Sequence, residues 1–229
     1  MTDKESVRSA WLNTFAKNTV TAPWGKAAQK LRGLPLYREA ATVFATPANS
    51  LYQARINCLV DGKNLVMPGP SIREGFYLLP ARSIPFKDVP AAVTYRGLAK
   101  KGQLLKIDDI AELSMGLLLT GSLAVDREGG RIGDGNGFFD LCCALLQELG
   151  GLQQEWSVMT LIREDLISTD LLPQDAWDIQ IAAAITQTGI HVFDPPFQKS
   201  RIFWDVLPTD RIKRIDPLWK LYREKQKSS

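Results

Sequence analysis

Short, unbroken apolar runs alternate with helical segments along most of this chain, and this alternation restricts the fold more than any other feature. The runs are ATVFATP (41–47), NLVMPGP (64–70), GFYLLP (75–80), MGLLLTGSLAVD (115–126) and EWSVMTLI (155–162). Between them, SLYQARINCLVDGK (50–63) and FFDLCCALLQELG (138–150) carry apolar residues at helical spacing. Strands without polar alternation are typical of sheets covered on both faces. The sequence therefore predicts a three-layer α/β/α fold with a mainly parallel sheet.

Other segments give weaker signals. Residues 4–17 predict an amphipathic helix, whereas 81–110 is irregular and is expected to hold turns or an edge element. PQDAWDIQIAAAITQTGIHVF (173–193) fits a helix or a hairpin around Gly189, and we favour strands after Asp178.

The tail from Asp194 onward changes in composition, with nine basic and five acidic residues and several prolines. We expect a single domain over 1–193 and a basic C-terminal extension over 194–229. The extension is either a solvated strap or helix packed by Trp204 and Trp219, or a contact with a partner or a phosphate.

Composition excludes several classes of protein. The net charge of +3 is too small for a nucleic-acid coat, and the three cysteines form no disulfide framework. The single histidine and the lack of a CxxC pair leave no zinc-type spacing. The N-terminus lacks a signal-peptide core, and no apolar run approaches the ~18 residues of a membrane span. We expect a cytoplasmic monomer or homodimer with small-molecule ligands and no nucleic-acid or membrane partner.

The stretch GGRIGDGNGFFD (129–140) packs five glycines into nine positions directly before a predicted helix. Glycines permit positive φ and close backbone approach, and a helix start offers free N–H groups with partial positive charge. Arg131 adds a full charge, and Asp140 lies where it could reach a phosphate-bound Mg²⁺. The Walker and dinucleotide patterns are absent, so a tight structural turn and an anion cradle both remain open.

GSLAVDREGGRIGDGNGFFD (121–140) resembles the signature of the 5-formyltetrahydrofolate cyclo-ligase (methenyltetrahydrofolate synthetase) family, and especially its divergent branch, the methenyltetrahydrofolate synthetase domain-containing proteins. KESVRSAW (4–11) is similar to the family's N-terminal Lys-x-x-x-Arg helix. GKNLVMP (62–68) and LLPQDAWDIQIAAAITQTGIHVF (171–193) resemble two further family segments in the expected order.

The resemblance implies the α/β fold shared with ribose-5-phosphate isomerase and CoA-transferase relatives. It also implies ATP- and Mg²⁺-dependent cyclisation of the reduced folate 5-formyltetrahydrofolate to 5,10-methenyltetrahydrofolate. In that reaction the formyl oxygen attacks the γ-phosphate, folate N10 attacks the resulting iminophosphate, and phosphate leaves. Such chemistry depends on positioning and charge neutralisation, so it needs no Ser/His/Asp or Cys/His set, and none is visible.

Carried over by position, the resemblance implies specific roles. Lys4 and Arg8 would contact the nucleotide phosphates, Arg131 would be the catalytic cation, and Asp140 and Asp178 would bind the metal. The nucleotide loop would consist of Gly130, Arg131, Ile132, Gly133, Asp134, Gly135, Asn136, Gly137 and Phe138. From the residues alone, a solvated helix face for the N-terminal cations and ordinary turn or helix-start positions for the aspartates remain open.

The chain also departs from the family pattern. Asp134 stands where active members carry a basic residue, and Phe138 and Phe139 replace paired tyrosines. Residues 48–53 contain no acid for the folate, and Tyr52, Gln53 and Arg55 stand in that region instead. Tyr52, Phe76 and Tyr77 are candidate aromatic walls or plain core residues.

These features leave three hypotheses. The chain is a folate cyclo-ligase or a close relative acting on a related pterin. Alternatively, it is a non-catalytic nucleotide- or folate-binding regulatory or interaction module on the same fold. As a third hypothesis, it is a related-fold enzyme for another anionic substrate, such as a sugar phosphate or a coenzyme A thioester.

Overall fold

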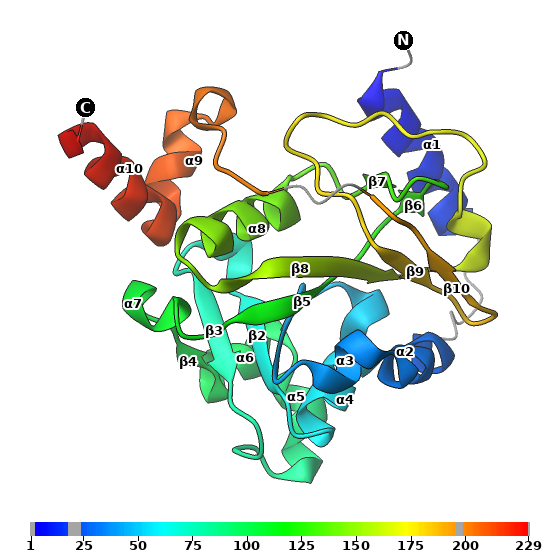
Figure 1. Cartoon of the computed structure of the whole chain (residues 1–229), viewed down its shortest axis with the longest axis horizontal. Helices are drawn as coiled ribbons and strands as arrows, with labels where there is room; N and C mark the ends of the chain where they lie inside the picture. Colours follow the sequence, from blue (N-terminus) through cyan, green and yellow to red (C-terminus); the bar gives the residue numbers. More distant parts are fainter. Residues whose placement is uncertain (1–2, 18–23, 196–198, 229) are drawn as a thin grey trace.

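The computed structural model describes residues 3–17, 24–195 and 199–228. An eight-stranded sheet with the order β10-β9-β8-β5-β1-β2-β3-β4 forms its centre (Figure 1). The parallel strands are β1 (Thr42–Ala45), β2 (Asn64–Pro68), β5 (Met115–Thr120), β8 (Leu152–Leu161) and β9 (Ala183–Ile185). The antiparallel strands β3 (Phe76–Leu79), β4 (Gln103–Leu104) and β10 (Ile190–Val192) lie toward the two edges. The predicted mainly parallel sheet is confirmed.

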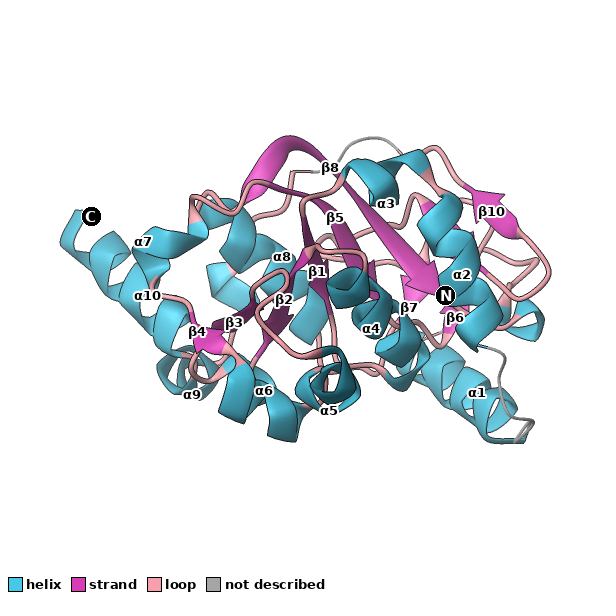
Figure 2. Ribbon diagram, turned by 90° about the horizontal axis from the view of Figure 1, so that it is seen from below, coloured by secondary structure: helices cyan, strands magenta, loops and turns pink. Residues whose placement is uncertain are grey.

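The sheet separates two hydrophobic cores, as the unalternating apolar strands require. In β1, Val43 and Ala45 face one core and Phe44 faces the other, and all three are fully buried. The first core is covered by α2 (Trp24–Gly33), α3 (Pro35–Glu39), α4 (Tyr52–Val60), α5 (Val89–Ala92) and α6 (Tyr95–Lys101). The second core is covered by α7 (Ile107–Ile110), α8 (Phe138–Glu148), α9 (Thr209–Arg214) and α10 (Asp216–Ser228). Figures 1 and 2 show the resulting three layers, which confirm the predicted fold class.

The apolar run 115–126 forms two strands rather than one. After β5, the chain turns at Gly121, where a Cβ would lie only 2.6 Å from the Cβ of Ala48. It then forms β6 (Ala124–Val125), which pairs antiparallel with β7 (Arg131–Ile132). The Asp126 carboxylate closes this hairpin by accepting the N–H groups of Gly130 and, across the fold, of Leu172. Apolar content could not reveal this break, because the run is apolar on both sides of it and the close approach of Gly121 to Ala48 exists only in the fold.

Two further expectations can be compared with the structure. The preference for strands after Asp178 is confirmed, since β9 and β10 form an antiparallel hairpin. The region 81–110 does contain the edge strand β4, but it also holds the short helices α5, α6 and α7, which its prolines and charges concealed. Short 3-10 turns complete the chain at η1 (Asn49–Leu51), η2 (Pro70–Ile72), η3 (Phe86–Asp88), η4 (Glu164–Leu166) and η5 (Trp204–Val206).

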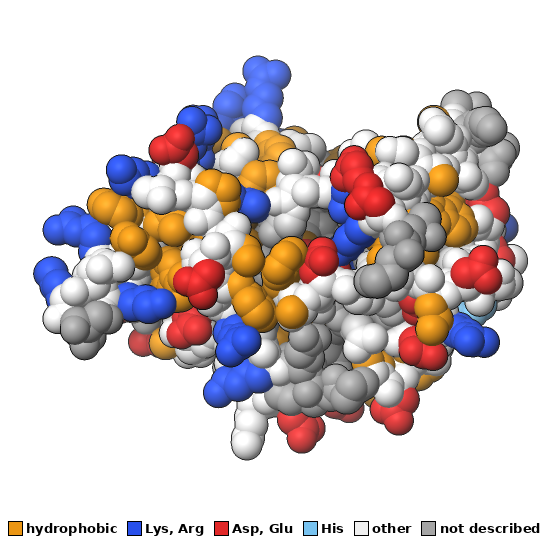
Figure 3. All heavy atoms as spheres, turned by 90° about the horizontal axis from the view of Figure 1, so that it is seen from above, with side chains coloured by type: hydrophobic (Ala, Val, Ile, Leu, Met, Phe, Trp, Pro, Cys, Tyr) orange, Lys and Arg blue, Asp and Glu red, His pale blue; other side chains and the backbone are white. Residues whose placement is uncertain are grey.

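The C-terminal segment packs against the rest of the chain. Ile212, Ile215 and Leu218 are buried in the same core as α8, and the rings of Trp219 and Tyr222 stack with centroids 5.8 Å apart. Lysine and arginine side chains are frequent at the left end of the molecule in Figure 3, where Figure 1 places α9 and α10. None of the described helices has the length and apolar character needed to cross a bilayer.

Candidate functional site

A cleft of about 790 Å³ opens at the carboxyl ends of the central parallel strands. Strand β1 has β2 on one side and β5 on the other, so the chain reverses its direction of winding there. In open α/β sheets, ligands bind at this switch point. The cleft is lined by residues 46–50 after β1, by 68–72 from the end of β2 and by 120–123 from the end of β5, together with the glycine loop 133–137.

The glycine loop joins β7 to α8 through backbone conformations that favour glycine. Gly135 has a φ of +89°, and Gly137, at the N-cap of α8, has a φ of +58°. The Asp134 carboxylate folds the loop by accepting the backbone N–H and the side-chain amide of Asn136, each at 3.0 Å. A Cβ on Gly135 would lie 3.0 Å from the guanidinium of Arg8. The loop therefore combines left-handed glycines with an arginine held close to the backbone.

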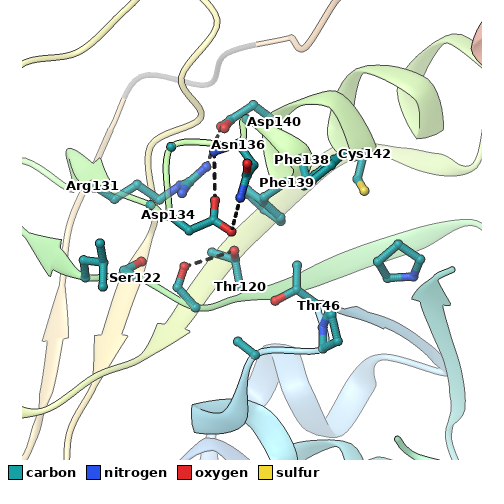
Figure 4. A pocket seen from close by; sticks show the side chains of 18 of the residues that line it. Thr46, Thr120, Ser122, Arg131, Asp134, Asn136, Phe138, Phe139, Asp140 and Cys142 are labelled. Carbon is teal, nitrogen blue, oxygen red and sulfur yellow. Dashed lines mark hydrogen bonds and ion pairs between the residues drawn. The ribbon is translucent and has the colours of Figure 1, made fainter. Parts of the chain in front are cut away.

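Arg131 lies at the wall of this cleft and is almost completely buried. Its Nη2 donates to Oδ1 of Asp140 at 2.5 Å (Figure 4). Its Nε donates to the Ile179 carbonyl at 3.2 Å. The guanidinium carbon lies 4.8 Å from the centroid of the Phe139 ring. Burial lowers the pKa of Arg131, but the adjacent Asp140 carboxylate, together with Cys143 and Asp178, raises it, and the net pKa is raised. The guanidinium is thus a fixed cation rather than a mobile one.

Helix α1 (Lys4–Lys17) brings the N-terminal cations to the same cleft. Its residues Val7 and Trp11 pack against Ala124, Ile132 and Leu172, which fixes the helix beside the β6–β7 hairpin. The predicted helix is confirmed. Of the apolar residues at helical spacing on it, Leu12 is 44% exposed, and the side chain of Phe15 lies outside the described part.

Both predicted N-terminal cations line the cleft. Arg8 donates from Nε to the Gly133 carbonyl at 3.2 Å and forms an ion pair with Glu5. Lys4 forms ion pairs with Asp175, at 2.7 Å, and with Asp178. The structure therefore brings Lys4, Arg8 and Arg131 together around the glycine loop, from segments more than 120 residues apart in sequence.

The two aspartates expected to hold a metal also line the cleft, and each already has partners. Oδ1 of Asp140 accepts from Arg131 and from the Ile179 N–H at 3.1 Å. Oδ2 of Asp178 accepts from Lys4 and from the Asp175 N–H at 2.7 Å. The described part of the chain contains no group of three or more His, Cys, Asp or Glu residues suited to a metal ion. This donor set fits a Mg²⁺ carried mainly by phosphates and not a dedicated protein cage.

Two hydroxyl groups in the cleft were not found from the sequence. Thr46 follows β1 and Ser122 follows β5, and both lie across the cleft from the glycine loop (Figure 4). Their Oγ atoms are buried and make no hydrogen bond with the described residues. Their positions at the carboxyl ends of the two central strands were the available signal. A buried hydroxyl without a partner is costly, so both groups are suited to a polar ligand.

The aromatic wall of the cleft differs from the candidates chosen by sequence. Tyr52, Phe76 and Tyr77 do not line it: Tyr52 donates to the Pro90 carbonyl, Phe76 is fully buried, and Tyr77 donates to Glu74. The aromatic residues that do line it are Trp24, Tyr95, Phe138, Phe139 and Trp177.

Arg55 has a structural position beneath the cleft. It is 3% exposed and donates to the carbonyls of Thr46, Ala48 and Val93 at 2.7 to 3.1 Å. Burial lowers its pKa to about 10, so it remains charged at neutral pH. Arg55 therefore braces the segment after β1, and Gln53 bonds to Asn57 instead of entering the cleft.

Known proteins resemble this chain in both sequence and fold. The model of the 5-formyltetrahydrofolate cyclo-ligase family matches residues 3–187. A methenyltetrahydrofolate synthase domain-containing protein of Danio rerio is 25% identical over 202 residues, which is 86% of this chain and 52% of that protein. A protein of the same description from Mus musculus is 24% identical over 209 residues, covering 89% of this chain and 55% of its own length. The chain thus spans about half the length of the curated relatives it matches.

Two solved structures share the fold. The 5,10-methenyltetrahydrofolate synthetase of Aquifex aeolicus gives a TM-score of 0.58 at 17% identity, covering 88% of this chain and 98% of that structure. The enzyme of the same name from Mycoplasma pneumoniae gives a TM-score of 0.52 at 14% identity, covering 81% and 99%. Because the family model matches residues 3–187, which are most of this chain, the chain belongs to the 5-formyltetrahydrofolate cyclo-ligase family.

Proposed function

We propose that the chain is an ATP- and Mg²⁺-dependent cyclo-ligase that converts 5-formyltetrahydrofolate, or a related formylated pterin, to its 5,10-methenyl form. One observation carries the proposal: Lys4, Arg8 and Arg131 converge on a glycine loop that opens into the cleft at the switch point of the sheet. Family membership supplies the reaction class.

The glycine loop is suited to the phosphates of a nucleotide. Its backbone leads into an 11-residue helix whose N-terminus carries partial positive charge, and Gly135 and Gly137 remove the side chains that would block close approach. Arg131 is held by Asp140 and by the Ile179 carbonyl, so its orientation is fixed before a ligand arrives. Such fixed charges stabilise a transferring phosphoryl group without reorganisation cost.

Magnesium would neutralise phosphate charge in this site, and Asp140 and Asp178 are the residues that would hold it. Each has one carboxylate oxygen outside the hydrogen bonds described above. One or two carboxylates together with phosphate oxygens and water form the usual environment of a nucleotide-bound Mg²⁺.

The opposite side of the cleft is suited to the pterin. The unpartnered hydroxyls of Thr46 and Ser122 offer both donor and acceptor capacity, and Tyr95 and Trp24 offer flat apolar surface. These groups would position the formyl oxygen toward the glycine loop, and orientation of this kind is a large part of phosphoryl-transfer catalysis.

A second candidate is a non-catalytic module that binds a nucleotide or a folate. Two observations favour it: Asp134 places a negative charge within the loop, and no acid lies in residues 48–53 to pair with the pterin. The two candidates differ in turnover, and only the nucleotide-binding form of the module would bind Mg-ATP as the cyclo-ligase does.

An optical assay separates them. Mixing the protein with Mg-ATP and 5-formyltetrahydrofolate should raise the near-ultraviolet absorbance of the methenyl product, while calorimetry measures Mg-ATP binding separately. Arg8→Gln should weaken Mg-ATP binding about tenfold or more, because one charged hydrogen bond to phosphate is worth ~1.5–3 kcal/mol. Lys220→Gln is the matched control: it makes the same charge change at an exposed residue of α10 and should have no effect on Mg-ATP binding.

Each outcome has a defined meaning. Nucleotide binding without an absorbance rise would support the non-catalytic module. Absence of nucleotide binding would contradict both candidates in their nucleotide-dependent form and would leave an anionic substrate of another kind.

A further inference from the structure

A third arginine contacts the glycine loop, and it comes from the C-terminal segment of the chain. Arg211 lies on α9, outside the residues 3–187 that match the family model. Its Nη2 donates to the Asn136 carbonyl at 2.7 Å, and its guanidinium carbon lies 4.9 Å from the centroid of the Phe138 ring. It therefore contacts two consecutive parts of the nucleotide loop, although it does not line the cleft itself.

The position of Arg211 is fixed by the core. The next residue, Ile212, is 3% exposed, and Ile215 and Leu218 follow it into the hydrophobic core that α8 also covers. Pro208 precedes the helix and accepts the backbone N–H of Arg211. Arg211 is therefore presented to the loop by a packed helix and not by a solvated tail.

The hydrogen bond to Asn136 sets the orientation of one loop peptide. In a trans peptide the C=O and the following N–H point in opposite directions. Because Arg211 holds the Asn136 carbonyl, the Gly137 N–H is turned away from Arg211. Asn136 and Gly137 line the cleft and Arg211 does not, so this contact lies on the outer side of the loop.

The charge of Arg211 is unusual for its location. It lies beside the start of α8, where the helix dipole is positive and cations are disfavoured. It also shares a partner with the Asp134 carboxylate, the one acidic side chain within the loop: Arg211 donates to the Asn136 carbonyl, and Asp134 accepts from the backbone N–H and side-chain amide of the same residue. Burial lowers the pKa of Arg211, and Asp134 opposes that shift only in part. A cation beside the start of α8 is favourable when an anion occupies the cleft. When the cleft holds no anion, the positive charge of Arg211 offsets the negative charge of Asp134.

We propose that Arg211 is a positioning residue of the nucleotide loop, so that the C-terminal segment completes the phosphate site of this chain. Arg211 orients the Asn136–Gly137 peptide and supplies the positive charge that Asp134 takes away from the loop. This inference rests on the proposed function, because it requires that the loop bind a nucleotide.

The test compares Arg211→Gln with Arg214→Gln in the full chain. Both variants remove one positive charge from α9, but Arg214 is exposed, whereas Arg211 is the residue of α9 that bonds to Asn136 and lies over the Phe138 ring. Calorimetry with Mg-ATP should show at least a tenfold loss of affinity for Arg211→Gln and less than a twofold change for Arg214→Gln. Affinity for 5-formyltetrahydrofolate alone should be unchanged in both, which a general loss of structure would not allow.

Two further variants separate charge from packing. Arg211→Lys keeps the charge and should recover Mg-ATP affinity to within about threefold of the parent chain. Adding Asp134→Asn to Arg211→Gln should restore most of the lost affinity, because it removes the charge that Arg211 offsets.

The results distinguish the two proposals. If the parent chain binds Mg-ATP and Arg211→Gln binds it equally well, the positioning role is refuted while the proposed function stands. If Arg211→Gln loses nucleotide and folate affinity together and Arg211→Lys restores neither, Arg211 is only a packing residue. If the parent chain binds no nucleotide, both proposals fail.

Discussion

The buried ion pair between Arg131 and Asp140 gives the sharpest test of how this site is built. Replacing Arg131 with Met keeps similar volume and removes the charge, which leaves the Asp140 carboxylate in a pocket where the residue is 9% exposed. Removing one partner of a buried pair costs ~3–5 kcal/mol, because the other charge stays desolvated. At ~2–4 °C per kcal/mol for a chain of this size, the melting temperature should fall by about 6–20 °C.

A second substitution should reverse much of this loss. Asp140→Asn removes the stranded charge, and its amide oxygen can still accept the Ile179 N–H. The double variant Arg131→Met/Asp140→Asn should therefore be more stable than Arg131→Met alone. Urea unfolding followed by tryptophan fluorescence measures the free energy of unfolding for the parent, the two single variants and the double variant.

Nucleotide affinity should stay low in the double variant even though stability is recovered. The double variant regains free energy of unfolding but has no cation at position 131, so its Mg-ATP affinity should remain as weak as that of Arg131→Met. If the double variant were less stable than Arg131→Met, the charge of Asp140 would not be the source of the cost. If it bound Mg-ATP like the parent chain, Arg131 would not contribute to the phosphate site.

Three other predictions test different parts of the structure. Gly135→Ala should lower the free energy of unfolding by ~1–2 kcal/mol, because φ there is +89°, and it should weaken Mg-ATP binding by displacing Arg8. Gly189→Ala is the control, because no atom lies within 4 Å of a Cβ built there, and equal effects of the two variants would contradict the loop conformation. Hydrogen bonds from Thr186, Thr188 and His191 lower the pKa of Glu164 from its usual value of 4.5. The ionised Glu164 carboxylate therefore stabilises the folded state above pH 4.5, and this stabilisation is lost as the pH falls through the lowered pKa. Urea unfolding should accordingly show a difference between the parent and Glu164→Gln at pH 7 that shrinks at pH 3, and a constant difference would refute the shift. Chelating Mg²⁺ should weaken ATP binding about tenfold or more, because Asp140 and Asp178 then repel the phosphates. If calorimetry gave the same ATP affinity with Mg²⁺ and with EDTA, a metal-binding role of the two aspartates would be refuted.

The fold could be predicted because its main signals are local. Runs such as ATVFATP and NLVMPGP are apolar on both faces, and this property alone requires helices on both sides of the sheet. The hairpin after Asp178 could be predicted from the Gly189 turn between two β-rich segments. The break in the run 115–126 could not, because the run is apolar on both sides of it and the close approach of Gly121 to Ala48 exists only in the fold.

Only those residues of the candidate site that belong to a sequence motif could be predicted. The glycine loop and the Lys4–Arg8 spacing identified the cations that the structure brings to the cleft. Thr46 and Ser122 were missed because a threonine or serine after a strand is common and carries no pattern. Arg211 was missed because its segment is separated from the loop by more than 70 residues and is distinguished only by net charge.

The charge of the cleft is nearly balanced within the protein, and this bears on why Asp134 is tolerated. Lys4 is paired with Asp178, Arg131 with Asp140 and Arg8 with Glu5, so each cation expected to meet phosphate already has an acidic partner. A polyanion entering alone would meet as many acids as bases, whereas a polyanion carrying a divalent cation would satisfy both sets at once. In such a site, one further carboxylate on the exposed loop is a small change, provided that a cation such as Arg211 is bonded to the same loop residue, Asn136. The departure at position 134 is therefore compatible with nucleotide binding for a reason that lies outside the motif, in the packing of α9 against the loop.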